Sequence, residues 1–302
     1  MRRKLVKQGR NALTTTLPAE WTSKHNLGPG DEVFVEDRDD SLMISAVESK
    51  GGDKKNVDVS GLDPMIKRVL GAIYKAGYDE AEVVFENSKE LETAQEVIRE
   101  EFIGFEVTHH GKNSLVFKNI STIDAKEFNT MMRRMFLIIK SMGEDCADAV
   151  KKNDYDFMKA IILRDKDVNK IADFCRRSLN SSGHLIEGRA PPLYFIAEQL
   201  EKIGDIYRDI CKLFVKDKIN LSAETLPFFS EANSFFGEFY KLYFDFDLKK
   251  MAEFGKKRYL LVDKIEKLIE AASKKEMPVI FYLRNIIENT FDMNGPLMAA
   301  KL

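Results

Sequence analysis

The sequence predicts a multidomain protein with a small strand-rich N-terminal domain, a middle α+β segment and a C-terminal all-α pair of three-helix bundles. Short runs of β-branched and apolar residues, separated by turn residues, occupy residues 1–50, which is typical of strands. From Asp124 onward, apolar residues recur at three- and four-residue steps, which indicates amphipathic helices. A chain of 302 residues also has room for more than one core. We therefore place the domains at residues 1–50, 51–120 and 121–302, and divide the last near residue 218.

The composition excludes several classes of protein. The chain carries 47 Lys and Arg against 49 Asp and Glu, with 44% hydrophobic residues, which fits neither a disordered chain nor a wholly basic nucleic-acid coat. No apolar run approaches the ~18 residues of a membrane helix, so we expect no membrane insertion. Cys146, Cys175 and Cys211 form no CxxC pair, and such scattered cysteines suit a reducing compartment. We expect a soluble cytoplasmic protein.

The N-terminal domain is expected to contain four short strands and one helix. Threonine-rich and apolar runs predict the strands, and Pro18 opens the helix because its missing N–H group costs nothing in a first turn. The expected strands cover residues 5–7, 12–17, 32–36 and 41–44, the helix residues 18–24, and a turn residues 27–31. These elements have few apolar residues with which to form an independent core, so we predict a homodimer through this domain.

Basic residues gather at the start of this domain. The first ten positions contain no acidic residue, and such an edge attracts nucleic-acid phosphates, although a merely solvated surface is the alternative. We expect phosphate contacts, which position a protein on DNA, rather than base contacts. The candidate DNA-binding residues are Arg2, Arg3, Lys4, Lys7 and Arg10.

The middle segment is expected to begin after a linker at residues 51–55. Beyond it the pattern alternates between strand and helix and ends in a hairpin, which predicts a small α+β module. The expected strands cover residues 57–59 and 81–85, the helices residues 64–75 and 89–99, and the hairpin residues 102–107 and 115–117.

The helical part reads as three helices followed by three more. Asn153-Asp154 supplies a start signal for the second helix, and Ala190-Pro191-Pro192 opens the third after a break at residues 181–183. The cycle starts again near Leu221. Short stretches of the two halves resemble each other, which indicates a diverged duplication. The matched stretches are 154–157 with 245–248, 168–171 with 262–265, and 200–205 with 287–292.

Carboxylates are repeated at helical spacing in both halves. Glu201 and Asp205 stand four residues apart, which places both on one helix face, and Gly204 between them is expected to leave that surface open. Clustered carboxylate oxygens are ligands for a hard metal ion. An ion-pair network with Lys166, Lys202 and Arg208 is the alternative. The candidate metal ligands are Asp165, Asn169, Glu201 and Asp205 in the first half, and Asp263, Glu288 and Asp292 in the second.

Catalytic motifs are missing from the sequence. It contains no GxSxG, no HExxH and no dinucleotide-binding glycine fingerprint. We therefore predict that the protein is not an enzyme, and a carboxylate–metal enzyme in the helical bundles is the remaining enzymatic alternative.

The N-terminal residues carry a family resemblance. The stretches 3–9 (RKLVKQG), 14–21 (TTTLPAEW) and 27–33 (LGPGDEV) resemble the AbrB/SpoVT DNA-binding family, over about the first 50 residues. The resemblance implies a swapped-hairpin fold in which two chains interleave and bind DNA.

The helical part carries a second resemblance. Residues 200–205 (LEKIGD) and 164–169 (RDKDVN) resemble motifs of the PhoU family of phosphate-uptake regulators, and the similarity covers residues 121–302. It implies two three-helix bundles that hold multinuclear iron or zinc on carboxylate motifs. The sequence departs from the family pattern at Asn169, at Tyr259, and at Thr290-Phe291.

The two resemblances together are similar to fused regulators typical of archaea. They predict a phosphate-responsive regulator that controls phosphate uptake by binding DNA. The alternative is an adaptor that does not bind DNA and that restrains a phosphate transporter or a sensor kinase.

Overall fold

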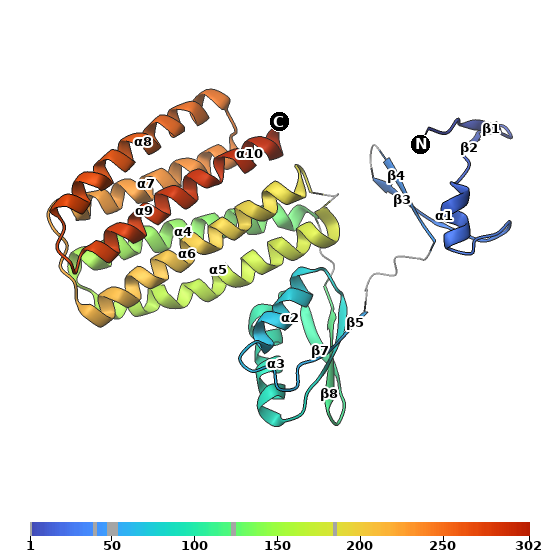
Figure 1. Cartoon of the computed structure of the whole chain (residues 1–302), viewed down its shortest axis with the longest axis horizontal. Coiled ribbons are helices and arrows are strands. Elements are labelled where there is room, and N and C mark those ends of the chain that lie inside the picture. The colour runs from blue at the N-terminus through green and yellow to red at the C-terminus, as the bar shows by residue number, and fades with distance from the viewer. Residues whose placement is uncertain (1, 39–40, 47–53, 122–124, 184–185) are drawn as a thin grey trace. The chain divides into compact units, whose positions relative to one another are not determined.

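The computed structural model describes residues 2–38, 41–46, 54–121, 125–183 and 186–302 (Figure 1). The chain forms two compact units, residues 1–53 and residues 54–302. The first unit is the predicted small β domain, called the head below. The second begins with the α+β segment, residues 54–121, called the module, and continues into the helical domain.

The head consists of two hairpins and one short helix. Strands β1 (Val6–Gln8) and β2 (Ala12–Thr14) pair antiparallel around a turn in which Gly9 adopts a φ of 69°, a value that favours glycine. Helix α1 (Ala19–Lys24) follows Pro18, as predicted. Strands β3 (Phe34–Arg38) and β4 (Ser41–Ser45) form the second hairpin.

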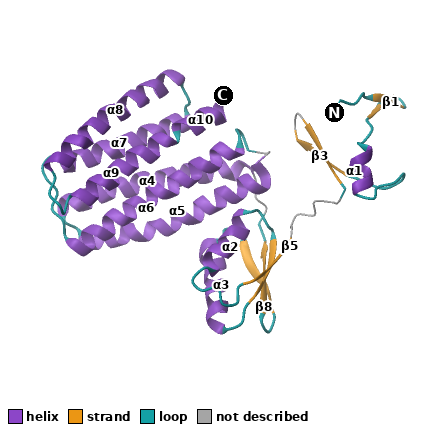
Figure 2. Cartoon of the chain, viewed as in Figure 1, coloured by secondary structure: helices purple, strands orange, loops and turns teal. Residues whose placement is uncertain are grey.

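The module is a four-stranded sheet with two helices on one face (Figure 2). The strand order is β5-β6-β8-β7, in which β5 and β6 run parallel and the other pairs antiparallel. Its elements are β5 (Lys54–Asp58), α2 (Ile66–Lys75), β6 (Glu80–Val84), α3 (Ser88–Glu101), β7 (Phe105–His110) and β8 (Ser114–Asn119). Alternate residues of β6 and β8, such as Ala81, Val83, Leu115 and Phe117, are buried together with residues of both helices.

The start of the module differs from the prediction. Lys54 and Lys55 were expected in a linker, but both lie in β5, paired with Glu80 and Ala81 of β6. The Nζ atom of Lys54 lies 3.6 Å from a carboxylate oxygen of Glu80 and 3.4 Å from one of Glu82. Opposite charges on neighbouring strands therefore extend a strand that an apolar pattern alone would start later. Residues 51–53 of the expected linker lie outside the described residues.

The helical domain contains the two predicted sets of three helices. The first set is α4 (Ala125–Lys152), α5 (Tyr155–Ser182) and α6 (Ala190–Asp217), and the second is α7 (Thr225–Phe244), α8 (Leu248–Ala271) and α9 (Met277–Asp292). A short helix, α10 (Asn294–Lys301), packs against α6 and α9. Buried residues of all seven helices form one continuous core, so the two sets share their interior.

Helices α5 and α6 begin at the residues where the sequence predicted their starts. The Asp154 side chain accepts a hydrogen bond from the backbone N–H of Phe157 at 3.0 Å and caps α5, while α6 opens on its two prolines. Met132, Met135 and Met142 of α4 and all three cysteines are buried in the core. Within the described residues, no helix combines the length and apolar character needed to cross a membrane.

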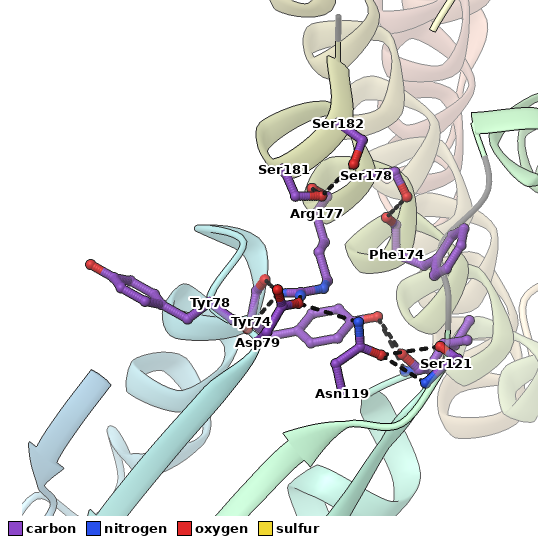
Figure 3. Close-up of polar contacts among 11 residues, drawn as sticks. Tyr74, Tyr78, Asp79, Asn119, Ser121, Phe174, Arg177, Ser178, Ser181 and Ser182 are labelled. Atoms are coloured by element: carbon purple, nitrogen blue, oxygen red, sulfur yellow. Dashed lines mark hydrogen bonds and ion pairs between the residues drawn. The ribbon is translucent and has the colours of Figure 1, made fainter. Parts of the chain in front are cut away.

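Arg177 links the module to the helical domain through hydrogen bonds and an ion pair (Figure 3). Arg177 of α5 is fully buried, and its guanidinium donates to the carbonyl oxygens of Tyr74 at 3.0 Å and Tyr78 at 2.7 Å, and to the Asp79 carboxylate. The same guanidinium lies 4.6 Å from the ring centroid of Phe105. Because these groups belong to α2, to the loop after it and to β7, the contact holds the module at the end of α5.

Candidate functional site

The candidate metal ligands of the first bundle lie where α5 and α6 pack side by side. Gly204 was expected to leave the surface of α6 open, and this expectation is wrong. A Cβ atom at Gly204 would lie 3.0 Å from Cγ1 of Val168 on α5, so the two helices approach each other closely at this glycine. This close approach brings the acidic faces of the two helices together.

Arg208 collects the carboxylates at one point of this seam. Its Nη1 donates to Oδ2 of Asp165 at 2.8 Å and to Oδ1 of Asp205, and its Nε donates to Asp209 at 2.9 Å. Asn169 donates to the same Asp165 oxygen at 3.3 Å. The structure therefore brings together three of the four candidates of the first half, Asp165, Asn169 and Asp205, around a guanidinium.

Two oxygen atoms of this cluster lack partners. Oδ1 of Asp165 and Oδ1 of Asn169 are buried and accept no hydrogen bond from the described residues. Burial raises the pKa of Asp205 to about 6, an effect that Arg208 opposes and the charge of Asp165 reinforces. The cluster is thus an acidic, partly buried site in which one cation is already in place.

Glu201 belongs to a second cluster, around Arg176. This arginine is buried, and its Nη2 lies 2.5 Å from Oδ1 of Asp173, while Nη1 donates to Glu198 and, at 3.3 Å, to Glu201. The Nζ atom of Lys75 in the module lies 3.5 Å from Oδ1 of Asp173. Burial raises the pKa of Glu201, and Arg176 counteracts this. Glu201 and Asp205 are therefore neighbours in sequence that pair with different arginines.

The second bundle arranges its candidates differently. Arg258 of α8 holds Glu288 in a bidentate ion pair with N–O distances of 2.8, 2.9 and 3.1 Å. Asp263 and Asp292 are exposed. Tyr259, which replaces an acid of the first bundle, is also exposed. The structure does not gather the three candidates into one group.

The arginines are the functional residues that the sequence pattern concealed. Arg208 was expected as a possible counter-charge, but Arg176 and Arg258 were not. Lys166, another expected counter-charge, faces the module instead, with its Nζ atom 3.7 Å from Oε2 of Glu100. The position of two arginines among apolar residues was the signal in the sequence that could have revealed the cluster around Arg176. Arg176 and Arg177 are charged residues within a buried stretch of α5 that includes the apolar residues Ala172, Cys175 and Leu179.

These residues do not fit the multinuclear metal site that the family resemblance implies. Across the described ranges, no three or more His, Cys, Asp or Glu side chains are grouped as metal ligands. The carboxylates that do converge face guanidinium groups, whose charge opposes that of a metal ion. The metal assignment therefore finds no support in this arrangement.

The candidate DNA-binding residues lie in the first hairpin of the head and just before it. Arg2, Arg3 and Lys4 precede β1, Lys7 lies within it, and Arg10 lies in the turn to β2. All five are exposed. A hairpin that carries cations at its base and at its turn can follow a phosphate backbone.

The fold combines a small β head, in which no residue of described burial is buried, with an α+β module and a helical domain. Two segments match known families. Residues 6–52 match the family described as antidote-toxin recognition MazE, bacterial antitoxin. Residues 132–214 match the PhoU domain. The chain thus has a MazE/AbrB-like segment followed by a PhoU domain in its first bundle, which confirms both resemblances.

Among solved structures, the chain has some similarity to the crystal structure of the phosphate transport system regulatory protein PhoU from Streptococcus pneumoniae. It is 13% identical, and the match covers 58% of this chain and 93% of that one with a TM-score of 0.47. None of the curated proteins compared with the chain matches it.

Proposed function

We propose that this protein is a phosphate-responsive regulator of phosphate uptake that binds DNA as a dimer through its head. The observation that carries the proposal is the presence in one chain of a MazE/AbrB-like segment and a PhoU domain. The first supplies a surface for DNA, and the second a body of the kind associated with phosphate transport.

The exposed basic edge supports the DNA-binding part of the proposal. Lys7 and Arg10 lie on one hairpin, and Arg2, Arg3 and Lys4 continue the positive charge toward its N-terminal end. A dimer would present this edge twice. Contacts of this kind release counterions from DNA, so binding would weaken steeply as salt is added.

Salt dependence tests this assignment residue by residue. We expect Lys7→Ala to weaken binding of the full-length protein to all duplexes alike, and to lower the slope of log K against log salt by about one unit for each lost phosphate contact. Lys24→Ala is the matched control, because Lys24 is also exposed in the head but lies at the end of α1. Loss of preference for one duplex with unchanged affinity for random DNA would contradict the assignment.

A second experiment tests the response to phosphate. Duplexes would first be selected from a random library by the full-length protein, and their retention then measured with and without inorganic phosphate. We expect retention to change with phosphate for the wild type. If no duplex binds in a salt-dependent manner, the head serves dimerisation alone, and the adaptor for a transporter or sensor kinase becomes the better account.

A further inference from the structure

We propose that arginine side chains are the resident counter-cations of the acidic clusters in the helical domain, and that they stand where the family resemblance places metal ions. Four of the seven candidate ligands are held this way: Asp165 and Asp205 by Arg208, Glu201 by Arg176, and Glu288 by Arg258. The inference concerns what makes these clusters stable, and it goes beyond the proposed regulatory function.

The Arg208 cluster shows how a guanidinium can take the place of a metal ion between carboxylates. One nitrogen, Nη1, bridges carboxylates from two helices, since Asp165 lies on α5 and Asp205 on α6. The Asp165 side chain is only 8% exposed. A buried carboxylate requires a cation or several hydrogen-bond donors, and here the guanidinium supplies both the charge and the donors.

The Arg176 cluster repeats the arrangement with one more acid. Three carboxylates from two helices surround a side chain that is 4% exposed, which makes this arginine the centre of the group. Its neighbour Arg177 faces the module. Two consecutive residues of α5 thus have different partners: Arg176 pairs with carboxylates of α5 and α6, and Arg177 pairs with the module.

The second bundle provides an independent case. Arg258 forms a bidentate pair with Glu288, the residue that corresponds to Glu201 in the internal repeat. Arginine matches the planar carboxylate geometry in a way that lysine does not. The same solution therefore occurs in both halves at equivalent acids.

This account leaves a latent cation site at Arg208. Without the guanidinium, Asp165 and Asp205 would face each other uncompensated, and the unpartnered Oδ1 atoms of Asp165 and Asn169 would be available as ligands. Carboxylate and amide oxygens suit Mn²⁺ and Mg²⁺. With the guanidinium in place, a divalent ion at the same point would be repelled.

The first test uses the wild-type full-length protein. It would be purified from medium supplemented with iron, zinc and manganese, analysed for metal content, and melted with and without chelator. We expect sub-stoichiometric metal and an unchanged melting temperature in chelator. Stoichiometric metal, or a melting temperature lowered by chelator, would overturn the proposal.

The second test exposes the latent site. We expect Arg208→Gln to melt several degrees lower than the wild type, because it leaves buried carboxylates unpaired. Added Mn²⁺ should recover much of that loss in the variant and leave the wild type unchanged. The triple variant Arg208→Gln, Asp165→Asn, Asp205→Asn should show no response to Mn²⁺.

Two further variants serve as controls. Arg99→Gln changes an exposed arginine of the module and should affect neither stability nor the response to Mn²⁺. Arg258→Gln frees only Glu288 and should lose stability without gaining a response to Mn²⁺. A folded Arg208→Gln protein that ignores Mn²⁺ would overturn the proposal, and if that variant fails to fold, the metal content and chelator response of the wild type decide the matter.

Discussion

The head and the module are two small domains of the same chain that differ in what they bury. Both are built from short strands with one or two helices. The module contains a cluster of fifteen buried apolar residues, including Tyr74, Phe102 and Phe117. In the head, no residue whose burial is described is buried, and Leu13 and Val35 are 63% and 56% exposed.

The difference shows how a domain of this size obtains a core. The module closes its sheet with two helices and adds a buried arginine from α5, so its partner is supplied by the same chain. The head leaves apolar side chains of both hairpins in solvent, among them Val6 and Leu42. If these side chains form one patch, such a surface is typical of an interface. A second head is the partner that the MazE/AbrB-like resemblance implies.

The largest expected effect concerns the association of the head. If the head dimerises as proposed, we expect Leu13→Asp in the full-length protein to give a monomer, because the substitution would place a charge in the apolar surface that the proposed dimer buries. Sedimentation velocity at micromolar concentration would measure the change. Leu163→Asp is the matched control, since Leu163 is similarly exposed on α5. A fragment of residues 1–52 that stays folded and monomeric would contradict the dimer.

The next effect tests the module's own core. Phe117 of β8 is fully buried, with ring centroids 5.8 Å from Phe102 and 5.7 Å from Phe105. We expect Phe117→Ala to lower the free energy of unfolding of the module by about 3–5 kcal/mol through lost burial and a cavity. Hydrogen exchange of module amides would measure it. Val84→Ala, at an exposed position of β6, should have a small effect, and association through the head should not change.

Much of the fold could be predicted from the sequence because its signals are local. Helix α5 begins at Asp154 and α6 at the Ala190-Pro191-Pro192 start, since capping and proline effects act within one turn. Helical spacing within α5 and within α6 also singled out Asp165 and Asp205 as candidates, although it does not specify that the two side chains meet. Even the weak core of the head could be inferred from how few apolar residues it has.

The remainder depended on contacts between distant residues. Gly204 determines how closely α5 and α6 approach, and only the position of Val168 reveals it. The pairing of Arg176 with Glu198, and of Arg258 with Glu288, depends on the rotation of one helix against another, which periodicity does not specify. The extent of β5 likewise depended on Glu80 and Glu82 in the neighbouring strand.

The smallest expected effect concerns a buried glutamate that binds two loops of the module. Glu90 near the start of α3 is buried, and its two carboxylate oxygens accept hydrogen bonds from the backbone N–H groups of Glu86 and Gly61, both at 2.8 Å. These bonds, with that from Glu86 the stronger, hold the pKa of Glu90 below its ordinary value of 4.5. The carboxylate therefore fixes the loops that follow β5 and β6.

A lowered pKa in the folded state means that ionised Glu90 stabilises the module above the ordinary pKa of glutamate, and that this contribution disappears as pH falls through the folded value. Glu90→Gln keeps the shape of the side chain but loses the charge, so it should destabilise the module at pH 7 and match the wild type progressively as the solution is acidified. Urea unfolding at a series of pH values would show the two curves converging. Glu92→Gln, on the exposed face of the same helix, should run parallel to the wild type throughout. A difference between Glu90→Gln and the wild type that stays constant down to acidic pH would mean that shape, rather than charge, holds these loops.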